Sequence, residues 1–554
     1  MYHRVDETFT LPVDGSTKES GELIWRAQNK PNKTFPVTKN NNKRIPGSVA
    51  SGRTLRRTTE ANRKANRGKA IAECKRYFGY RYSKGETKSC DEYPFASTAE
   101  GAKTGSDGQS PNRHYAVEAM NDRHNSNAGS KLSEFYRDQR MLRTQDVFYV
   151  KLVNPDGTPY KGPSEPSGAA AQVNYRQCSG DLPQIKEVQR KAAPEQKFLN
   201  YAQSTASGWT GGDSTYSVDL PDGRRLFLFS DTFLGPENAD GSRPENAKII
   251  NSSFVAQSGG SLSTIKRGSS SNPMAIMPPT IKGERWYWLG DGMIATIDGR
   301  KYLQVVFQEY RHTHDGTELP LEFVRNVVAT FELSNLKRPI WIDPLPSEIG
   351  VAWGSALLPK GRSGDNYTYI YGVSNEKRNK KMHIARVYGK DLSDVKNWQF
   401  IKKSETVPDK WMKNEKDGTK YLPGVMNEYS VTPWRDQFVV ISQDSTEAFS
   451  SKIRLWSGCD PYSFGFWVDN DEVYRMPEVG LWGSYGDPQV VAYNAHAHPT
   501  LQSGDRWTLS YNVNTFDFSD HFLDTSIYKP RFVSFRLVPW SGGTRSSKNF
   551  VPVE

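Results

Sequence analysis

Two adjacent carboxylates, Asp91 and Glu92, stand in the segment SCDEYPFASTAEG, between a cysteine and a tyrosine–proline corner. The later segment RHNSNAGSKLSEFY contains Asn125 and Glu134, which we place at or within the start of a helix. Hydrolysis of a phosphodiester needs a base that activates water and a metal ion that neutralises the developing charge. Carboxylate and amide oxygens suit Mg²⁺ or Mn²⁺. The pattern predicts a one-metal site, with Asp91 and Glu92 as catalytic residues and Asn125 and Glu134 as metal ligands.

The same residues also have structural interpretations. Glu92 would then only accept hydrogen bonds from the backbone of the turn. Asn127 would cap the following helix, as Asn often does. Asp91 has the strongest case for a catalytic role among these residues.

The chain around this pair is basic. Residues 1–150 hold 27 Lys and Arg against 17 Asp and Glu, whereas the whole chain holds 73 against 62. A helix predicted over 58–74 follows Arg56 and carries Arg63 and Arg67. Because residues three or four apart share a helix face, these arginines could form one stripe that binds the phosphates of DNA. The alternative is an ordinary solvated helix face.

A second pair of carboxylates, Asp213 and Asp231, lies almost symmetrically about Asp222 in a hairpin predicted over 209–235. If the turn is Pro221-Asp222-Gly223, the two aspartates are cross-strand neighbours with Cα atoms about 5 Å apart. A two-residue turn would place them on opposite faces. Glycoside hydrolysis requires two such carboxylates, one as the acid and the other as the nucleophile or base. The structural alternative is that each aspartate binds nearby backbone.

Further polar residues near predicted strand ends are candidate glycan ligands, namely Glu428, His496, His498 and Arg531, and Asp291 has a similar position. His496 and His498 share a strand face and could bind a metal ion or a sugar. The alternative is that both histidines are structural. Four tryptophans could stack on sugars or fill the core between sheets: Trp209, Trp286, Trp288 and Trp353.

The elements that must position these residues change in character near residue 197. Helices predicted over 58–74 and 130–142 and a strand over 146–153 make residues 46–155 a small α+β domain. From 197 to 545, short aromatic and β-branched runs alternate with turn residues. This length of antiparallel strands suits an all-β five-bladed β-propeller, and a two-sheet sandwich is the alternative. The fold class is therefore multidomain.

Two segments are predicted to be linkers. Residues 1–45 are polar and rich in Lys and Asn, which is typical of a linker or arm. Residues 156–196 begin with a Pro/Gly/Ser-rich stretch and continue as a charged segment. No run of about 18 apolar residues occurs, so no membrane span is expected. The N-terminus also lacks the apolar region of a secretory signal peptide.

The four cysteines have no CxxC spacing, so a zinc site is not expected. Cys74 and Cys90 bracket a short segment and could form a disulfide worth about 3 kcal/mol. The sequence does not indicate whether the protein is in an oxidising compartment, because no signal peptide is visible.

Four segments of the first domain carry a family resemblance. NRGKAIAEC, SCDEYPFASTAEG, NSNAGSKLSEFY and DVFYVKL resemble the successive blocks of the NucA/NucB deoxyribonuclease family, over about residues 46–153. The resemblance implies a reduced ββα-metal core of the His-Me finger type, a divalent ion, and cutting of DNA without sequence specificity. It also implies that Asp91 replaces the usual histidine base and that Asn125 opens the metal-bearing helix.

The second half carries another resemblance, over about residues 200–540. GGDSTYSVDLPDGRRLFLFSDTFLG, IINSSFVAQSGGSLSTI and AHPTLQSGDRWTLSYNVN resemble a domain of unknown function that is common in secreted actinobacterial proteins. It is similar, more distantly, to five-bladed propeller glycosidases that act on D-arabinan. That relationship implies that Asp213 and Asp231 are the catalytic acids.

These observations predict a metal-dependent, non-specific deoxyribonuclease fused to a glycoside-hydrolase-like propeller. Its partners would be DNA and a cell-envelope polysaccharide such as arabinan. The combination fits an exported effector or toxin, with an immunity protein as a candidate partner, or an enzyme that degrades extracellular DNA. Secretion would follow a cytoplasmic stage and use a route without a visible Sec signal peptide. The alternative is a propeller glycosidase or glycan-binding protein whose N-terminal domain only anchors it to DNA.

Overall fold

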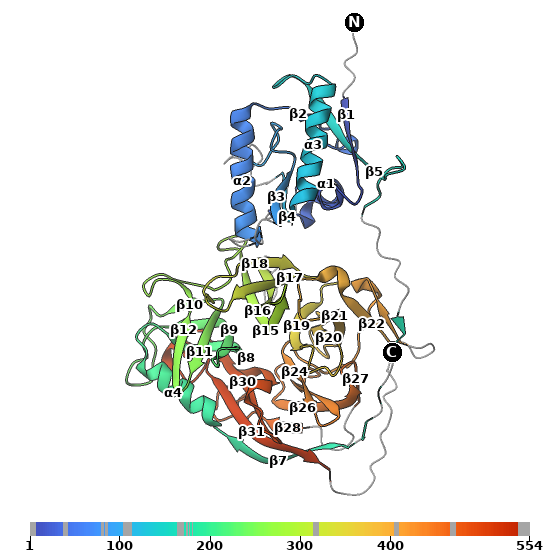
Figure 1. Ribbon diagram of the computed structural model, residues 1–554. Coiled ribbons are helices and arrows are strands. Elements are labelled where there is room, and N and C mark those ends of the chain that lie inside the picture. Colours follow the sequence, from blue (N-terminus) through green and yellow to red (C-terminus); the bar gives the residue numbers. More distant parts are fainter. Residues whose placement is uncertain are drawn as a thin grey trace. The chain divides into compact units, whose positions relative to one another are not determined.

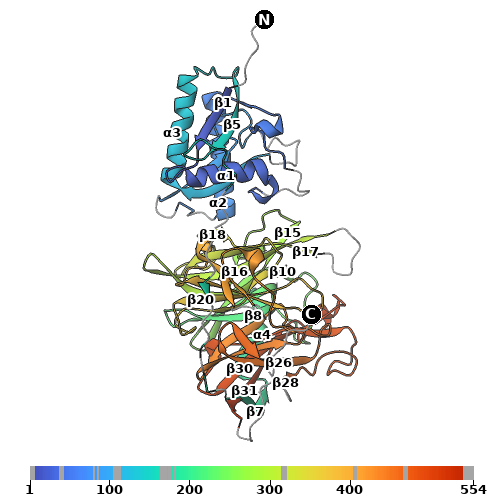
Figure 2. The ribbon, with the colours of Figure 1, turned by 90° about the vertical axis from the view of Figure 1, so that its right-hand side faces the viewer.

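The computed structural model describes residues 7–36, 43–78, 82–83, 87–103, 114–162, 171–172, 176, 178–179, 181–313, 321–403, 409–465 and 472–540. The chain divides into two compact units: the first comprises Met1–Glu165 and the short segments Pro279–Gly283 and Ile340–Ile342, and the second comprises the rest. Figures 1 and 2 show that the first unit mixes helices and strands, whereas the second is built mainly of strands.

The helices in the described residues are too short or too polar to cross a membrane.

The first unit contains a three-stranded sheet, a separate strand pair and helices (Figure 1). Its elements are β1 (Glu7–Pro12), α1 (Lys18–Asn29), β2 (Leu55–Arg56), α2 (Glu60–Phe78), β3 (Lys88–Tyr93), β4 (Ala116–Asn121), α3 (Asp122–Asp138) and β5 (Val147–Val153). In the sheet, β5 lies between β1, to which it is parallel, and β2. β3 and β4 form an antiparallel pair that contacts α1, α2 and α3.

The N-terminal segment is folded, so the prediction of a linker over residues 1–45 is wrong for its described part. β1 pairs with β5 along its whole length. Helix α1 buries Leu23, Ile24 and Ala27 in the core that also contains Phe148. The buried apolar residues of α1 have the spacing of one helix face. Residues 1–6 and 37–42 lie outside the described residues.

Two other elements of this unit match their predictions closely, and one does not. The helix predicted over 58–74 is α2, and the strand predicted over 146–153 is β5. Helix α3 begins eight residues before its predicted start, because Asn121 caps it by accepting a hydrogen bond from the Arg123 N–H at 3.0 Å. Asn127 is therefore not the cap, and Asn125 lies in the first turn of the helix.

The second unit contains five sheets in its described residues, besides the short ribbon of β13 (Arg267–Gly268) and β14 (Pro273–Met274). Blade 1 comprises β8 (Trp209–Asp219), β9 (Arg225–Leu234), β10 (Lys248–Ile250), β11 (Ser253–Ser258) and β12 (Ser261–Ile265). Blade 2 comprises β15 (Arg285–Ile297), β16 (Arg300–His312), β17 (Leu321–Glu332) and β18 (Trp341–Pro344).

The other three sheets continue this order along the chain. Blade 3 comprises β19 (Ala352–Leu358), β20 (Tyr367–Val373), β21 (Met382–Tyr388), β22 (Gln399–Lys402), β23 (Lys410–Met412) and the earlier β6 (Ala171–Gln172). Blade 4 comprises β24 (Tyr429–Trp434), β25 (Gln437–Gln443), β26 (Lys452–Asp460), β27 (Ser463–Gly465) and β28 (Glu472–Arg475). Blade 5 comprises β29 (Val490–Ala497), β30 (Arg506–Thr515), β31 (Pro530–Pro539) and the earlier β7 (Pro183–Arg190). The short helix α5 (Asp520–Leu523) lies between β30 and β31.

The five sheets form a ring, as the blades of a propeller do (Figure 1). The inner strand of each blade contacts that of the next, in the order β8, β15, β19, β24 and β29, and β30 of the last blade contacts β8. This arrangement confirms the five-bladed propeller and excludes the two-sheet sandwich. The predicted end at residue 545 lies outside the described residues.

Much of the segment predicted to be a linker over residues 156–196 belongs to the propeller, so that prediction is wrong. β7 pairs with β31 as the outer strand of blade 5, β6 pairs with β23, and α4 (Ala193–Ser204) contacts β8 and β31. The pattern of β7 gives no apolar signal, because most of its residues are exposed at the sheet edge.

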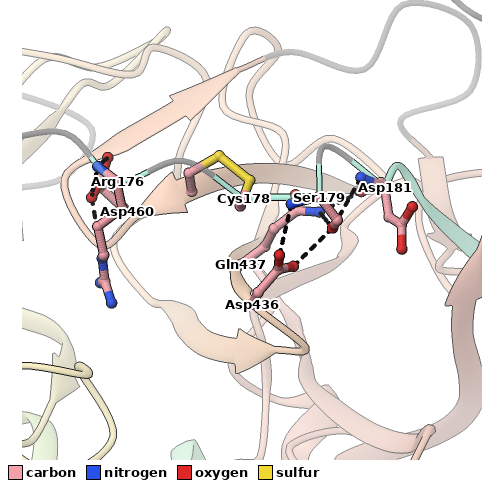
Figure 3. Close-up of a disulfide and its surroundings, with 8 residues drawn as sticks. Arg176, Cys178, Ser179, Asp181, Asp436, Gln437 and Asp460 are labelled. Carbon is pink, nitrogen blue, oxygen red and sulfur yellow. Dashed lines mark hydrogen bonds and ion pairs between the residues drawn. A yellow bond between two sulfur atoms is a disulfide. The ribbon is translucent and has the colours of Figure 1, made fainter.

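A disulfide between Cys178 and Cys459 ties the middle of this segment to blade 4 (Figure 3). Beside it, the Ser179 N–H donates to Asp436 Oδ2 at 2.6 Å, and Gln437 Nε2 donates to the Asp181 carbonyl at 2.6 Å (Figure 3). The segment is therefore attached to the propeller by covalent and polar contacts and by little apolar burial.

Candidate active sites

Asp91 lies on β3, opposite Glu118 of β4. Its carboxylate accepts a hydrogen bond from the Ser20 hydroxyl at Oδ2 and one from the Glu92 N–H at Oδ1, both at 2.8 Å. Burial raises the pKa of Asp91 to about 6, although these two hydrogen bonds act in the opposite direction. A carboxylate with such a pKa can accept a proton from water near neutral pH.

Asn125 is anchored to the same strand. Its Nδ2 donates to Ser89 Oγ at 2.8 Å and to the Cys90 carbonyl at 2.9 Å, so the amide is fixed just before Asp91 in the chain. The nitrogen faces the strand, and Oδ1 is the oxygen that remains for a ligand. Cys90 is also joined to Cys74 of α2 by a disulfide, the pairing that the sequence allowed.

Glu92 pairs with Arg67 rather than with the backbone of the turn. Arg67 Nη1 lies 2.7 Å from Glu92 Oε2 and also donates to the Cys90 carbonyl. The Glu92 side chain is only 4% exposed, and burial raises its pKa to about 7 against the opposing charge of Arg67. Arg67 and Asn125 therefore donate to the same carbonyl, that of Cys90, and Arg67 places a positive charge beside it.

The predicted stripe of three arginines is wrong for Arg56. Arg63 and Arg67 are four residues apart on α2 and share a face. Arg63 pairs with Glu60 of the same helix at 2.5 Å. Arg56 lies instead on β2, where its N–H donates to Glu100 Oε2 at 2.9 Å. Helix α2 begins after this position, so the helical spacing does not apply to Arg56.

Glu134 does not share a site with Asn125, so the prediction that both residues bind one metal ion is wrong. Both residues lie on α3, nine positions apart. Nine residues are two and a half helical turns, which places the side chains on opposite faces and about 13 Å apart along the axis. Glu134 is exposed.

Within the described residues, no group of three or more His, Cys, Asp and Glu side chains could hold a metal ion. A different donor set is present at β3, where the free amide oxygen of Asn125 is a hard ligand. Mg²⁺ keeps several of its waters and is often held by only one or two protein oxygens. These residues therefore fit a largely hydrated Mg²⁺ or Mn²⁺ ion, with Asn125 as its protein ligand.

In the propeller, Asp213 is held by two tyrosines of blade 5. The Tyr493 hydroxyl donates to Oδ1 at 2.7 Å, and the Tyr528 hydroxyl donates to Oδ2 at 2.6 Å. Burial and the charge of Asp231 nevertheless raise the pKa of Asp213 to about 7. Asp213 can therefore hold or release a proton near neutral pH.

The hairpin that carries Asp213 and Asp231 has the predicted three-residue turn, since the Leu220 N–H donates to the Arg224 carbonyl at 2.8 Å. The strands do not remain in simple register, however. Gly212 pairs with Thr232 and Ser214 with Phe229, so a β-bulge separates these pairs and contains both aspartates. The two residues are close enough for their charges to interact, as expected, but through a bulge and not as a regular cross-strand pair.

Asp231 is engaged by two donors of its own. Asn251 Nδ2 and Trp288 Nε1 both donate to Oδ1 of Asp231, each at 2.9 Å. Burial raises the pKa of Asp231, and these two bonds act against burial. The side chain is thus oriented by fixed partners next to Asp213.

Two further carboxyls belong to the same site. Glu428 Oε1 lies 2.7 Å from the Ser214 hydroxyl, and burial, followed by the charges of Asp213 and Asp291, raises the pKa of Glu428 well above its usual value. Asp291 accepts hydrogen bonds from the Gly292 and Leu357 N–H groups, each at 2.8 Å, and burial raises its pKa to about 7. The sequence pattern did not assign Asp291, because only the ring of blades brings it to Asp213 and Glu428.

Comparison with protein families agrees with this division of the chain. Residues 195–540 match the model of a domain of unknown function, DUF5005. The chain belongs to the DUF5005 family. Residues 37–151, which include Asp91 and Asn125, match the model of deoxyribonuclease NucA/NucB. Both predicted resemblances are confirmed.

Several solved structures resemble the DUF5005 propeller. One is a protein from Bacteroides ovatus, assigned only provisionally as a hydrolase; it is 19% identical with a TM-score of 0.51, and the match covers 66% of this chain and 93% of that one. Another is an α-L-arabinofuranosidase from Podospora anserina in complex with cellotriose, with 8% identity, a TM-score of 0.32, and 60% and 92% coverage. A third is a GH43_1 enzyme from Xanthomonas citri in complex with xylotriose, with 13% identity, a TM-score of 0.32, and 63% and 93% coverage. At such identities the likeness concerns the fold alone. No curated protein matches the chain by sequence.

The two histidines predicted as glycan ligands, His496 and His498, differ in their surroundings. His496 Nδ1 lies 2.9 Å from the Asn494 carbonyl and 3.6 Å from Glu428 Oε2, and burial lowers the pKa of His496 to about 4. His496 is therefore neutral and adjoins the carboxyl site. In His498 both ring nitrogens are engaged, with the hydroxyls of Ser217 and Ser510, each at 2.8 Å. His498 is buried and both of its ring nitrogens have protein partners, which favours the structural interpretation.

A small cavity of about 20 Å³ lies where the inner strands of the DUF5005 blades meet. It has room for about one water molecule. All five blades contribute to its lining, which includes Tyr216, Asp291, Leu357, Tyr429, His496 and His498.

Arg531 does not lie at the carboxyl site of the DUF5005 unit. Its Nη2 donates to the Tyr485 hydroxyl at 2.7 Å and to the Ser526 carbonyl at 3.0 Å, and its Nε lies 3.5 Å from Glu478. These contacts fasten the loops around blade 5. The prediction of Arg531 as a glycan ligand is therefore wrong. It was based on the position of this residue at a strand end.

Proposed function

We propose that the N-terminal unit is a divalent-metal-dependent deoxyribonuclease that cuts DNA without sequence preference. The observation that carries this proposal is the anchoring of Asn125 on β3 directly before Asp91. The order β3, β4 and α3 is that of the ββα-metal motif, with the base on the first strand and the ligand on the helix. The match of residues 37–151 to the NucA/NucB model supports the same activity.

In the proposed reaction, Asp91 accepts the proton of the water that attacks the phosphodiester. Ser20 and the Glu92 N–H hold the Asp91 carboxylate in one orientation. A bound Mg²⁺ or Mn²⁺, with Asn125 as its protein ligand, would neutralise charge on the phosphate. Arg67, held by Glu92, supplies a fixed cation to the DNA backbone.

Plasmid nicking tests this proposal. The wild type with Mg²⁺ or Mn²⁺ should convert supercoiled plasmid to open circles, and EDTA should stop the reaction. Asp91→Asn should abolish nicking, whereas Asp138→Asn, an exposed aspartate on α3, should not change it. If Asp91→Asn nicks DNA as fast as the wild type, Asp91 is not the base.

For the propeller, we propose glycoside hydrolysis, with Glu428 as the acid and Asp213 as the base or nucleophile. The observation that carries this second proposal is the gathering of buried carboxyls: Asp213 and Asp231 share one β-bulge, and Glu428 lies 2.7 Å from the hydroxyl of Ser214, the residue next to Asp213. Burial raises the pKa values of Asp213, Asp291 and Glu428. Glu428 keeps its proton and can give it to a leaving group. Asp231 is assigned to the catalytic group as the residue whose charge adds to burial in raising the pKa of Asp213. A non-catalytic, glycan-binding propeller is the alternative.

Polysaccharide digestion separates these two functions of the propeller. Arabinan and arabinogalactan, as cell-envelope glycans, are the first substrates to test, with xylan beside them. Sugar release should disappear in Asp213→Asn and Glu428→Gln but persist in Asp222→Asn, a variant at the exposed hairpin tip. The absence of sugar release from every substrate would favour the binding function.

We further propose that the protein acts outside the cell, as a toxin or effector with an immunity partner or as a scavenger of DNA. All four cysteines form disulfides, and such bonds persist in oxidising compartments. Immunoblots of medium and lysate from the producing organism should find the protein in the medium. Retention of the whole amount in the lysate would oppose export.

A further inference from the structure

A row of aromatic side chains lies on one face of blade 2. Trp286 and Trp288 alternate along β15 and so point to the same face, and Tyr310 of β16 pairs with Trp286. Ring centroids are 5.6 Å apart for Trp286 and Trp288, 4.8 Å for Trp288 and Tyr310, and 4.6 Å for Trp286 and His312. We call these four residues the blade 2 aromatic row.

The row is not part of the propeller core. Trp209 and Trp353, which had the same two interpretations from sequence, are 0% and 1% exposed and fill the space between sheets. Trp286, Trp288 and Tyr310 are only partly buried, and His312 is exposed. A contiguous line of partly exposed rings is a kind of surface at which ligands bind.

The row reaches the carboxyl site at one end. Trp288 Nε1 donates to Asp231 Oδ1 at 2.9 Å, and Asp231 acts on Asp213 through its charge. Tyr310 also lies within the electrostatic reach of Glu428, whose charge adds to burial in raising the pKa of Tyr310 to about 12. A molecule on the row would thus extend directly into the site.

The ion pairs of these strands lie on the opposite face of β16. Arg311 and the buried Glu309 alternate with Tyr310 and His312 along the strand, and they pair with Glu322 and Arg325 respectively, each at 2.6 Å. A row of rings whose neighbouring ion pairs lie on the other face suits an uncharged ligand that presents C–H groups to aromatic faces, as sugar rings do.

We propose that the blade 2 aromatic row binds consecutive sugar residues of a neutral polysaccharide, next to the residue held by Asp213 and Glu428. The substrate is then a polymer, and its length is sensed by stacking on Trp288, Tyr310, Trp286 and His312 in turn. This inference rests on the proposed glycoside hydrolase function of the propeller. It extends that function from the reacting bond to the chain that carries it.

Binding and turnover are measured separately to test the row. Affinity gels that contain arabinan, arabinogalactan or xylan measure binding by the Asp213→Asn protein, which does not cut the chain. In that background Trp286→Ala should weaken retention by roughly tenfold for the polysaccharide that binds, and Trp286→Phe should keep most of it. Trp482→Ala removes a tryptophan that is 96% exposed elsewhere and should not change retention.

In the active protein, Trp286→Ala should lower kcat/KM for the polymer relative to that for a short aryl glycoside by about tenfold. Retention of wild type without any sugar release would support the row and reject the hydrolase function. Equal retention of Trp286→Ala and Trp482→Ala would overturn the inference, as would the absence of retention on all three gels. An equal loss on polymer and short glycoside would also overturn it, since that loss would lie at the carboxyl site.

Discussion

The surroundings of Asp213 lower the stability of the folded propeller and at the same time suit this residue for proton transfer. It receives two tyrosine hydroxyl bonds, yet its pKa is raised because burial and the charge of Asp231 prevail. The backbone around it is strained as well. Ser214, Thr215 and Tyr528 have φ of 72°, 76° and 76°, values that L residues rarely adopt. Such strain collects at sites where geometry serves function.

Asp213→Asn should make the propeller more stable at high pH. The folded pKa of about 7 exceeds the ordinary value of 3.8, so the folded state holds the proton more tightly. The contribution of Asp213 to stability is therefore fully present below about pH 4 and is lost as the pH rises through 7. At pH 8 the variant should melt about 2–4 °C above the wild type, and the difference should shrink towards pH 5.

Thermal melts of both proteins at several pH values check this expectation. Asp222→Asn is the control, because Asp222 is exposed at a turn and its pKa is lowered by Arg224. A difference between Asp213→Asn and wild type that is the same at pH 5 and pH 8 would contradict the assignment of a raised pKa.

Ser20→Ala should slow DNA nicking by about tenfold, because it removes a hydrogen bond to a charged group at the Asp91 carboxylate. Ser20→Thr keeps the hydroxyl and should restore most of the rate. Initial nicking rates at saturating metal measure the effect. An Ala variant as fast as the wild type would show that Ser20 only packs against β3.

At the scale of elements, the sequence reveals those with a clear apolar period and misses those that depend on partners. Helix α2 and strand β5 were predictable from their own residues. β1 and α1 were missed because a polar composition concealed one apolar face, and β7 was missed because it is an exposed edge strand. At the candidate sites, Asp91 and Asp213 could be selected as candidates from motifs. Asp291 could not be assigned, since its position depends on neighbouring blades in the ring.

Removing the disulfide between α2 and β3 should destabilise the nuclease unit and leave the propeller intact. The Cys74–Cys90 bond closes a loop of 16 residues, which is worth about 3 kcal/mol in the chain-entropy model. The variant Cys74→Ala with Cys90→Ala should lose nicking activity at a lower temperature than the wild type. Sugar release should keep its temperature dependence.

The matched control for that experiment replaces Cys178 and Cys459, which belong to the propeller. This second variant should leave the temperature dependence of nicking unchanged. Equal effects of both pairs on nicking would contradict the assignment of each disulfide to a separate unit.

At the scale of the whole molecule, the two units have separate cores and separate candidate sites. The charge asymmetry of the sequence agrees with this division, because most of the net charge of +11 lies in the first 150 residues. The proposed substrates, DNA for the basic unit and an uncharged glycan for the nearly neutral unit, agree with that distribution.

The two activities should therefore be separable by single substitutions. Asp91→Asn should abolish nicking and keep full sugar release, and Asp213→Asn should do the reverse. Both assays on the same two preparations check this. Loss of both activities in either variant would indicate that the units depend on each other.

The pairing of β7 with β31 has a consequence for synthesis. The sheet of blade 5 is completed by β7, a strand made before blade 1, which pairs with β31 near residue 535. At a translation rate of about 5–20 residues per second, tens of seconds pass between the synthesis of β7 and that of β31. During that time its hydrogen-bonding edge is open to other chains. The nascent polypeptide therefore needs protection from contact with other chains until its last blade has been synthesised.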